Sequence, residues 1–121
     1  MPRTKIQTYP DGVLRIYRVR PETPYGQVAE SDMDIIAEMV RFANRKVGMS
    51  RFWTGWSAGE RIDQLVRIPL MRGVTVETGN VVRLFGAVGD PDVFYTVLQA
   101  QTDLEGGFCD LSLGVMGVDQ R

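Results

Sequence analysis

The order of hydrophobic and polar residues predicts that most of this chain forms β-strands. The clearest alternation lies in CDLSLGVM, residues 109–116, where Cys, Leu, Leu and Val alternate with Asp, Ser and Gly. Residues 13–20, VLRIYRVR, are rich in β-branched and aromatic residues and have the usual length of a strand. Two further segments, VVRLFG at 81–86 and VFYTVLQAQ at 93–101, flank the turn sequence AVGDPD, so we expect them to form a hairpin.

One β-like segment leaves a choice between strand and helix. Residues 61–70, RIDQLVRIPL, carry an alternating apolar face that Gln64 interrupts. A short helix over residues 60–67 also fits, because its apolar residues share one side, and Pro69 would end it early. Both alternatives stay open at this point.

Residues 31–48, SDMDIIAEMVRFANRKVG, predict the single α-helix of the chain. Apolar residues recur at helical spacing between positions 35 and 43. Ser31 or Asp32 can cap the start, basic residues occupy the last turn, and Gly48 ends the segment.

Together these elements describe a mainly β protein of the α+β type. We expect a small β-barrel or sandwich of five to six antiparallel strands, with one packed α-helix and extended loops. Residues 1–121 have the length of a single domain. Residues 1–12 carry two prolines and end in a PDG turn, so we expect a flexible N-terminal arm.

The amino-acid composition excludes more classes of function than any sequence motif does. The 14 basic and 15 acidic residues give a net charge of −1, so no overall basic field indicates binding to nucleic acid or an anionic membrane. The chain has no histidine and one cysteine, which excludes a Ser-His-Asp triad, a Cys-His dyad, imidazole metal ligands and an internal disulfide. No apolar segment has the length of a signal or membrane-spanning segment, so we expect a soluble protein without membrane contact.

The segment GWSAG, residues 55–59, matches the G-x-S-x-G pattern letter for letter. In α/β-hydrolases this pattern places a nucleophilic serine on a sharp turn between a strand and a helix. That fold repeats βα units, whereas this chain predicts one helix, and no histidine can accept the proton of Ser57. We therefore interpret residues 55–59 as a turn between two strands and predict that the protein is not an enzyme.

Carboxylates, glycines and the cysteine give no binding motif. Two pairs of aspartates, in DMD at 32–34 and DPD at 90–92, are explained by a helix start and a hairpin turn, and neither fits a calcium loop. The glycines of GAVGDP spell neither a phosphate loop nor a dinucleotide fingerprint. Cys109 lies on the apolar face of its strand. We predict no metal site and no cofactor.

Arginines and one aromatic cluster are the strongest candidates for a binding role. In RFWTGW, the alternation of a strand places Trp53 on the face opposite Phe52 and Trp56. Trp53 would then lie near the surface with Arg51, and an exposed Trp beside an Arg is typical of protein–protein hot spots. Core packing and stacking on single-stranded nucleic acid are the alternatives. The strand arginines can simply be solvated charges on strand edges, and with a net charge near zero we favour ion pairs between subunits over a phosphate-binding surface. The predicted interface residues are Arg15, Arg18, Arg20, Arg51, Trp53, Arg67 and Arg72.

Four segments of the chain follow one another in a recognisable order. They are DGVLRIYRV at 11–19, VGMSRFWTGWSAGERIDQLVRIP at 47–69, FYTVLQAQTD at 94–103 and the closing CDLSLGVM at 109–116. With a helix between the first two, this order resembles that of small head–tail joining proteins of tailed bacteriophages. These are the head-closure, or stopper, proteins of the connector. The likeness covers residues 11–116 and rests on the order and composition of the segments.

The resemblance implies a structural role without catalysis. Proteins of this family form a ring of identical subunits under the portal or adaptor, help to retain packaged double-stranded DNA in the channel, and dock the tail protein. The chain would then belong to the virion neck and to the host cytoplasm during assembly. Near-neutral charge suits a channel through which DNA slides. By composition, the lumen or docking residues are Pro24, Tyr25, Gln27, Asp103, Glu105 and Phe108.

Two other functions fit the same segments. Another structural role in the virion, as a tail-completion or minor capsid component, would produce a similar β-rich sequence. A small nucleic-acid-binding barrel of the OB type is the other alternative, and the net charge of −1 argues against it.

Overall fold

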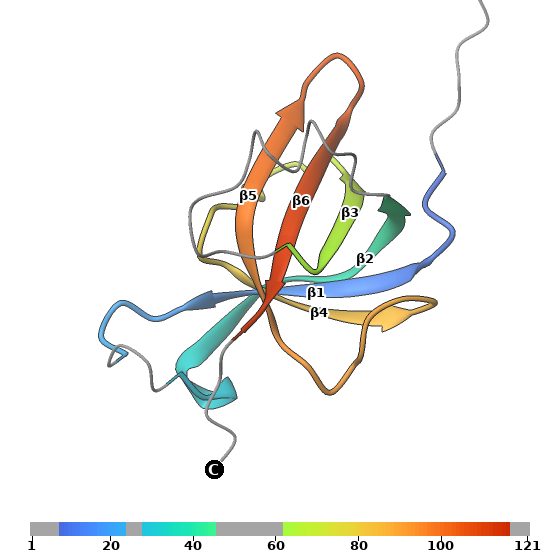
Figure 1. Ribbon diagram of the computed structural model, residues 1–121. Helices are drawn as coiled ribbons and strands as arrows, with labels where there is room; N and C mark the ends of the chain where they lie inside the picture. The colour runs from blue at the N-terminus through green and yellow to red at the C-terminus, as the bar shows by residue number, and fades with distance from the viewer. Residues whose placement is uncertain (1–7, 24–27, 46–61, 117–121) are drawn as a thin grey trace, which may run out of the picture.

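The computed structural model describes residues 8–23, 28–45 and 62–116 of the chain. Its strands run antiparallel and form one sheet that closes on itself (Figure 1). The elements are β1 (Gly12–Val19), the 3₁₀ turn η1 (Glu30–Asp32), β2 (Met33–Arg45), β3 (Gln64–Pro69), β4 (Val81–Gly86), β5 (Tyr95–Asp103) and β6 (Phe108–Val115). The prediction of a mainly β fold with five to six antiparallel strands is confirmed. Within the described ranges, no helix is long and apolar enough to cross a membrane.

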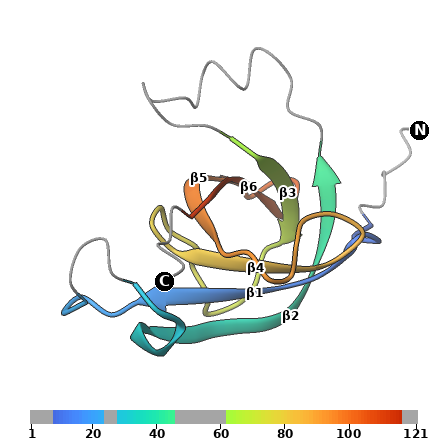
Figure 2. The same ribbon diagram turned by 60° about the horizontal axis from the view of Figure 1, so that its bottom comes forward.

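The sheet closes because its first strand has two partners. β1 pairs with β2 along one edge and with β4 along the other, and β6 pairs with both β3 and β5. The resulting order is β1-β2-β3-β6-β5-β4, with β4 returning to β1. Figure 2 shows β4, β1 and β2 side by side along one part of the closed sheet, with β5, β6 and β3 along the other.

Side chains that alternate inward from the strands form the main core. In β6, Leu111 and Leu113 are completely buried, as the alternation predicts, but Val115 at the strand end is 53% exposed. Burial of one such aliphatic side chain contributes about 1.5–3 kcal/mol relative to leaving it in water. The same inward alternation occurs in β1, β3, β4 and β5, with the buried residues Leu14, Ile16, Val66, Ile68, Val82, Leu84, Tyr95 and Val97. The choice left open for residues 60–67 is settled as a strand from Gln64 onwards.

The α-helix predicted over residues 31–48 is wrong. Residues 33–45 form the 13-residue strand β2, which follows directly after the single turn η1. β2 pairs with β1 from Met33 to Phe42 and with β3 from Ala43 to Arg45. This strand therefore links the two parts of the sheet, a position that a helix packed across the sheet could not occupy.

Two bulges in β2 explain the helix-like spacing. Between the pairs Leu14↔Val40 and Ile16↔Ala37, β2 has one residue more than β1, and the next pair, Tyr17↔Ile35, adds another. Each extra residue shifts the inward alternation by one position, so apolar residues occur in neighbouring pairs. One member of each pair points outward. Ile35 is 48% exposed beside Ile36, which packs on the core, and Met39 is 73% exposed beside buried Val40.

Met39 has an unusual backbone conformation at the first of these bulges. Its φ of 57° lies in the left-handed region, and among the described residues it is the only one other than glycine with a positive φ. This conformation costs an L-residue roughly 1–2 kcal/mol, and a glycine normally occupies such a bulge position. Because the Met39 backbone is strained and its side chain is exposed, a substitution at this position tests the bulge geometry.

Replacement of Met39 by glycine is expected to raise the free energy of unfolding by up to about 1 kcal/mol, because glycine relieves the left-handed strain. Urea denaturation measures the change. The matched control is Ile35→Gly, an exposed position on the same strand without a positive φ, where glycine is expected to cost about 0.5–1 kcal/mol. Equal losses in both variants would contradict the bulge geometry.

The predicted hairpin between residues 81–86 and 93–101 is confirmed, although its ladder is short. β4 and β5 pair only through Val81↔Thr96 and Val82↔Tyr95. The longer hairpin is formed by β5 and β6, which pair from Tyr95↔Val115 to Asp103↔Phe108. Residues 104–107 connect these two strands, and this turn lies at the top of Figure 1, just beyond the last pair of the β3–β6 ladder, Pro69↔Phe108.

Candidate interaction surfaces

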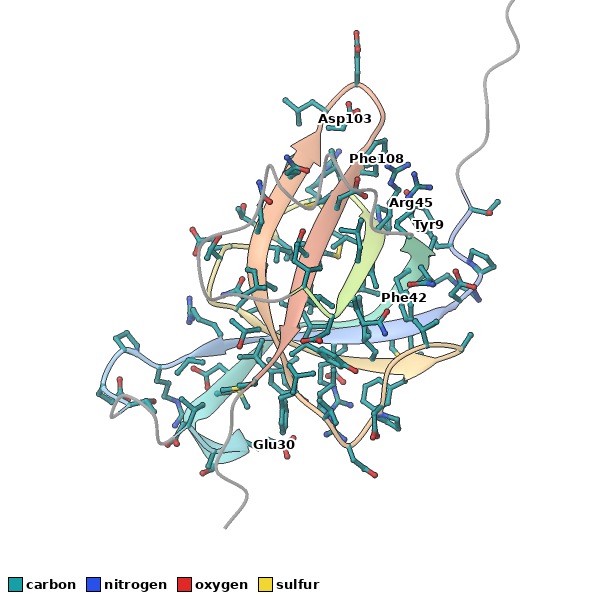
Figure 3. The ribbon with its side chains drawn as sticks, viewed as in Figure 1. Tyr9, Glu30, Phe42, Arg45, Asp103 and Phe108 are labelled. Carbon is teal, nitrogen blue, oxygen red and sulfur yellow. The ribbon has the colours of Figure 1, made fainter. Side chains whose placement is uncertain are left out.

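The tip of the β5–β6 hairpin brings together three of the predicted docking residues. Asp103 and Phe108 lie opposite each other in the last pair of the ladder, and Glu105 lies in the turn between them (Figure 3). The Oδ1 atom of Asp103 accepts a hydrogen bond from the Gly106 amide at 2.8 Å, and its carbonyl accepts one from the Gly107 amide at 2.9 Å. Leu104 is 82% exposed. The turn therefore presents an apolar and an acidic side chain on a hydrogen-bonded frame.

An ion pair between β3 and β6 lies close to the turn of this hairpin. Arg67 and Asp110 lie opposite each other and form two hydrogen bonds, Nε to Oδ1 at 2.7 Å and Nη2 to Oδ2 at 3.0 Å. Their side chains are only 11% and 5% exposed. The Arg67 guanidinium lies 3.5 Å from the centre of the Phe108 ring, so Arg67 contacts two residues of β6, Asp110 and Phe108.

Hydrogen bonding and burial shift the ionisation of this group. The hydrogen bond to Asp110 raises the pKa of Arg67 above its ordinary value. Burial raises the pKa of Tyr9, which lies near Arg67 and Asp110 at the same end of the molecule (Figure 3). Both shifts keep Arg67 charged and the Tyr9 hydroxyl protonated at neutral pH.

A second surface, the arginine–aromatic face, lies on the outside of β1 and β4. It is formed by Arg15, Tyr17, Arg83, Phe85 and Phe94. Arg15 and Arg83 are direct partners in the β1–β4 ladder. Both guanidinium groups lie over the Phe85 ring, at 5.5 and 5.2 Å from its centre, and Arg83 also lies 5.2 Å from the Phe94 ring. Arg15 donates a hydrogen bond to the Tyr17 hydroxyl at 3.1 Å, and the rings of Tyr17 and Phe94 meet edge to face at 5.7 Å.

Two exposed glutamates flank this face. Glu38 Oε1 is 3.3 Å from Arg15 Nε, and Glu30 Oε2 is 3.7 Å from Arg83 Nη1. The glutamate side chains are 54% and 56% exposed, whereas those of Arg15 and Arg83 are 30% and 20% exposed. Like charges directly opposite in a sheet repel, so the aromatic rings and the acids together hold the two cations in place. The arginines are the fixed part of this surface and the glutamates are the exposed part.

The remaining predicted interface arginines are dispersed. Arg20 follows β1 and forms an exposed ion pair with Asp34, with 3.1 Å between Nη2 and Oδ1, and the hydrogen bond to Asp34 raises the pKa of Arg20. Arg18 and Arg72 are exposed and form no ion pair with the residues that the structure describes. The other predicted residues, together with Ser57, lie outside the described ranges: Pro24, Tyr25, Gln27, Arg51 and Trp53.

Sequence reasoning missed Arg83 and its aromatic neighbours. Within VVRLFG, Arg83 and Phe85 share one face of the strand, while Val82 and Leu84 point to the core. That parity is visible in the sequence. The sequence does not indicate that β4 pairs with β1, which is the step that places Arg83 opposite Arg15.

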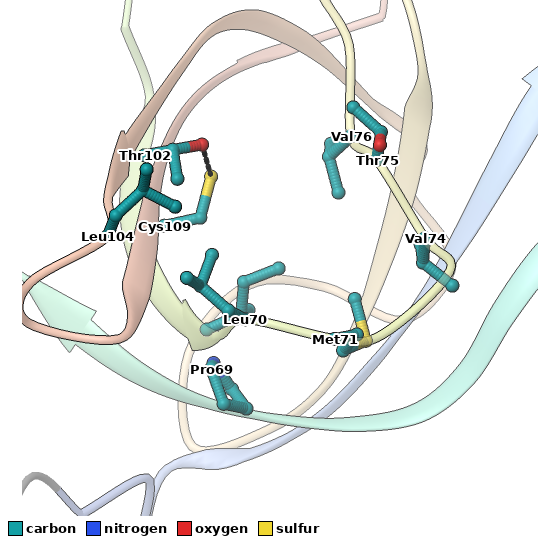
Figure 4. Close-up of a pocket in the computed structure, with 10 residues that line it drawn as sticks. Pro69, Leu70, Met71, Val74, Thr75, Val76, Thr102, Leu104 and Cys109 are labelled. Atoms are coloured by element: carbon teal, nitrogen blue, oxygen red, sulfur yellow. Dashed lines mark hydrogen bonds between the residues drawn. The ribbon is translucent and has the colours of Figure 1, made fainter.

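An apolar pocket of about 290 Å³ lies beside the hairpin, between the end of β3 and the β3–β4 connection (Figure 4). Leu70, Met71, Val76 and Leu104 contribute to its lining, and Cys109 lies at one wall. The Thr102 hydroxyl donates to the Cys109 sulfur at 3.7 Å. Burial raises the pKa of the Cys109 thiol above its ordinary value of 9.0, so the thiol stays protonated and weakly reactive at neutral pH.

We expect the Cys109 thiol to make stability fall at alkaline pH. Because the pKa is raised in the folded state, the unfolded chain loses this proton first, and the free energy of unfolding decreases as pH rises above about 9. Urea denaturation between neutral and alkaline pH measures the slope. Cys109→Ala is expected to be less stable at neutral pH but to have a shallower alkaline decline, and an unchanged slope in this variant would contradict the assignment.

Within residues 8–23, 28–45 and 62–116, no three Cys, Asp or Glu side chains are grouped so as to hold a metal ion. Comparison of the chain with protein-family models, with curated proteins and with solved structures finds no match. The two surfaces are therefore interpreted from their own geometry, which is typical of protein–protein contacts.

Proposed function

We propose that this protein is a structural subunit of the neck of a tailed bacteriophage. It forms a ring of identical copies beneath the portal or adaptor, helps to retain packaged DNA, and docks the tail. The observation that carries the proposal is the β5–β6 hairpin, whose exposed turn lies at one end of the closed sheet while an ion pair with 5–11% exposed side chains holds β6 to β3 close to that turn. An exposed turn on a hydrogen-bonded, ion-paired hairpin is suited to linking subunits, and the order of the sequence segments supports the connector family.

The charge of the hairpin tip favours docking to protein over contact with DNA. Asp103 and Glu105 are acidic, and the tip turn carries no basic residue between positions 101 and 108. Carboxylates repel the phosphates of packaged DNA. We therefore assign the hairpin to contacts with a subunit or partner, and the contact with sliding DNA, which the near-neutral net charge of −1 permits, to other parts of the ring.

Phage particles assembled without this chain test the proposal. We expect heads that package DNA and then lose it, or full heads without attached tails, when the particles are imaged by electron microscopy. Labelling of the chain in complete particles should place it between head and tail. Normal tailed, infectious particles in its absence would overturn the proposal, and a label along the tail or on the capsid would assign the chain to another structural role in the virion.

A further inference from the structure

We infer that the hairpin tip of one copy docks on the arginine–aromatic face of the next copy. This inference rests on the proposed ring and identifies the two surfaces that form it. The donor surface is the turn with Leu104 and Glu105, and the acceptor surface is the pair Arg15 and Arg83 with the ring of Phe85.

The donor surface is a turn that exposes one apolar and one acidic side chain. Leu104 is 82% exposed, a position that costs solvation free energy unless a partner covers the side chain. Asp103 already accepts the turn hydrogen bonds from the Gly106 and Gly107 amides. Glu105, adjacent to Leu104, makes no ion pair with the described residues. Its carboxylate is therefore the acidic group that the tip offers to a neighbour.

The acceptor surface has two guanidinium groups beside an aromatic ring, and each is paired with an exposed glutamate of the same chain. Arg15 and Arg83 lie opposite each other, 5.5 and 5.2 Å from one aromatic ring, so their positions are set before a partner arrives. Arginine and aromatic side chains dominate the energy of protein interfaces, and pre-positioned groups lose less entropy on binding. Glu30 and Glu38 are more than half exposed. Exposed ion pairs of this kind contribute little, so the carboxylate of a neighbour can share or replace them.

The two surfaces lie at opposite ends of the molecule. In Figure 3, Asp103 at the hairpin tip is at the top, and Glu30, which pairs with Arg83, is at the bottom. One copy therefore cannot satisfy its own acceptor with its own hairpin. Contacts between two different surfaces are heterologous, and repeated from copy to copy they generate a ring when the rotation closes. This is the type of contact that the proposed function requires.

Charge reversal tests the pairing directly. By sedimentation velocity over a concentration series, Glu105→Arg and Arg83→Glu should each weaken self-association by about 100-fold, since like charges then meet at the contact. An equimolar mixture of the two variants should associate again. In the mixture each arginine tip meets a glutamate face, and each unchanged tip meets an unchanged face.

Controls separate this contact from folding and from the proposed function. Glu77→Arg makes the same change in charge at an exposed position of the β3–β4 connection and should associate like the original chain. Circular dichroism checks folding, and Arg15→Glu replaces Arg83→Glu if the latter unfolds. Single variants that associate normally, a mixture that stays dissociated, or an original chain that is monomeric at every concentration would overturn the inference. The particle experiment tests the neck assignment independently of these outcomes.

Discussion

Replacement of Asp110 by alanine is expected to lower the free energy of unfolding by about 3–5 kcal/mol. The side chains of Asp110 and Arg67 are 5% and 11% exposed and share two hydrogen bonds. Without Asp110, the guanidinium remains in a site that is largely closed to water and loses its bidentate acceptor. Chemical denaturation of the purified protein measures the loss.

The exposed ion pair of the same chain provides the matched control. Asp34 pairs with Arg20 at 3.1 Å, but these side chains are 46% and 42% exposed. Asp34→Ala is therefore expected to cost about 0–1 kcal/mol, because water replaces the lost partner. The double variant Arg67→Met, Asp110→Leu should recover most of the stability, since apolar residues of similar size leave no charge buried. Equal losses in Asp110→Ala and Asp34→Ala would contradict the buried character of the Arg67–Asp110 pair.

Replacement of Gly86 by alanine is expected to destabilise the protein by about 3 kcal/mol or more. Gly86 pairs with Gly12 where β4 meets β1, and a Cβ atom at Gly86 would overlap the Asp11 carbonyl oxygen and lie 2.7 Å from the Gly12 Cα. These are backbone atoms, so no side-chain rotation can relieve the overlap. Thermal and urea denaturation of Gly86→Ala measure the loss.

Gly73→Ala is the control for this substitution. Gly73 has a φ of +78° but open space around the position of a Cβ atom, so alanine there is expected to cost only about 1–2 kcal/mol of backbone strain. Gly86 has no positive φ, so its larger loss would report the close approach of β1 and β4 alone. A Gly86→Ala protein as stable as the original would mean that the two strands can separate at this end without loss.

The fold could be predicted where the inward alternation is uninterrupted. β1, β4, β5 and β6 follow the sequence pattern because each side chain's direction is set by its own strand. β2 could not be predicted, because its two bulges convert an alternating strand into one with neighbouring apolar residues, and local sequence does not record a bulge. The helical spacing predicted that Ile35 and Met39 lie on a buried face, but both side chains point outward.

The interaction surfaces could be predicted only in part. Asp103, Glu105 and Phe108 are close in sequence, so a turn between strands was enough to bring them together. Arg67 was predicted as an interface residue from its strand position alone. Its ion pair with buried Asp110 could not be predicted, because it depends on the pairing of β3 with β6. Arg83 was missed because its role depends on Arg15, and only the long-range pairing of β1 with β4 makes them neighbours.

If copies join as proposed, the same long-range ladder couples their assembly to folding. The β5–β6 hairpin closes through a turn of a few residues, whereas β1 and β4 pair residues as far apart in the sequence as Gly12 and Gly86. Pairing over such separations is slow relative to hairpin formation. A chain that has formed the hairpin but not closed the sheet carries the donor tip without the acceptor face, because Arg15 and Arg83 are still apart. In the proposed ring, an incompletely folded subunit would attach to its neighbour but would not receive the next copy.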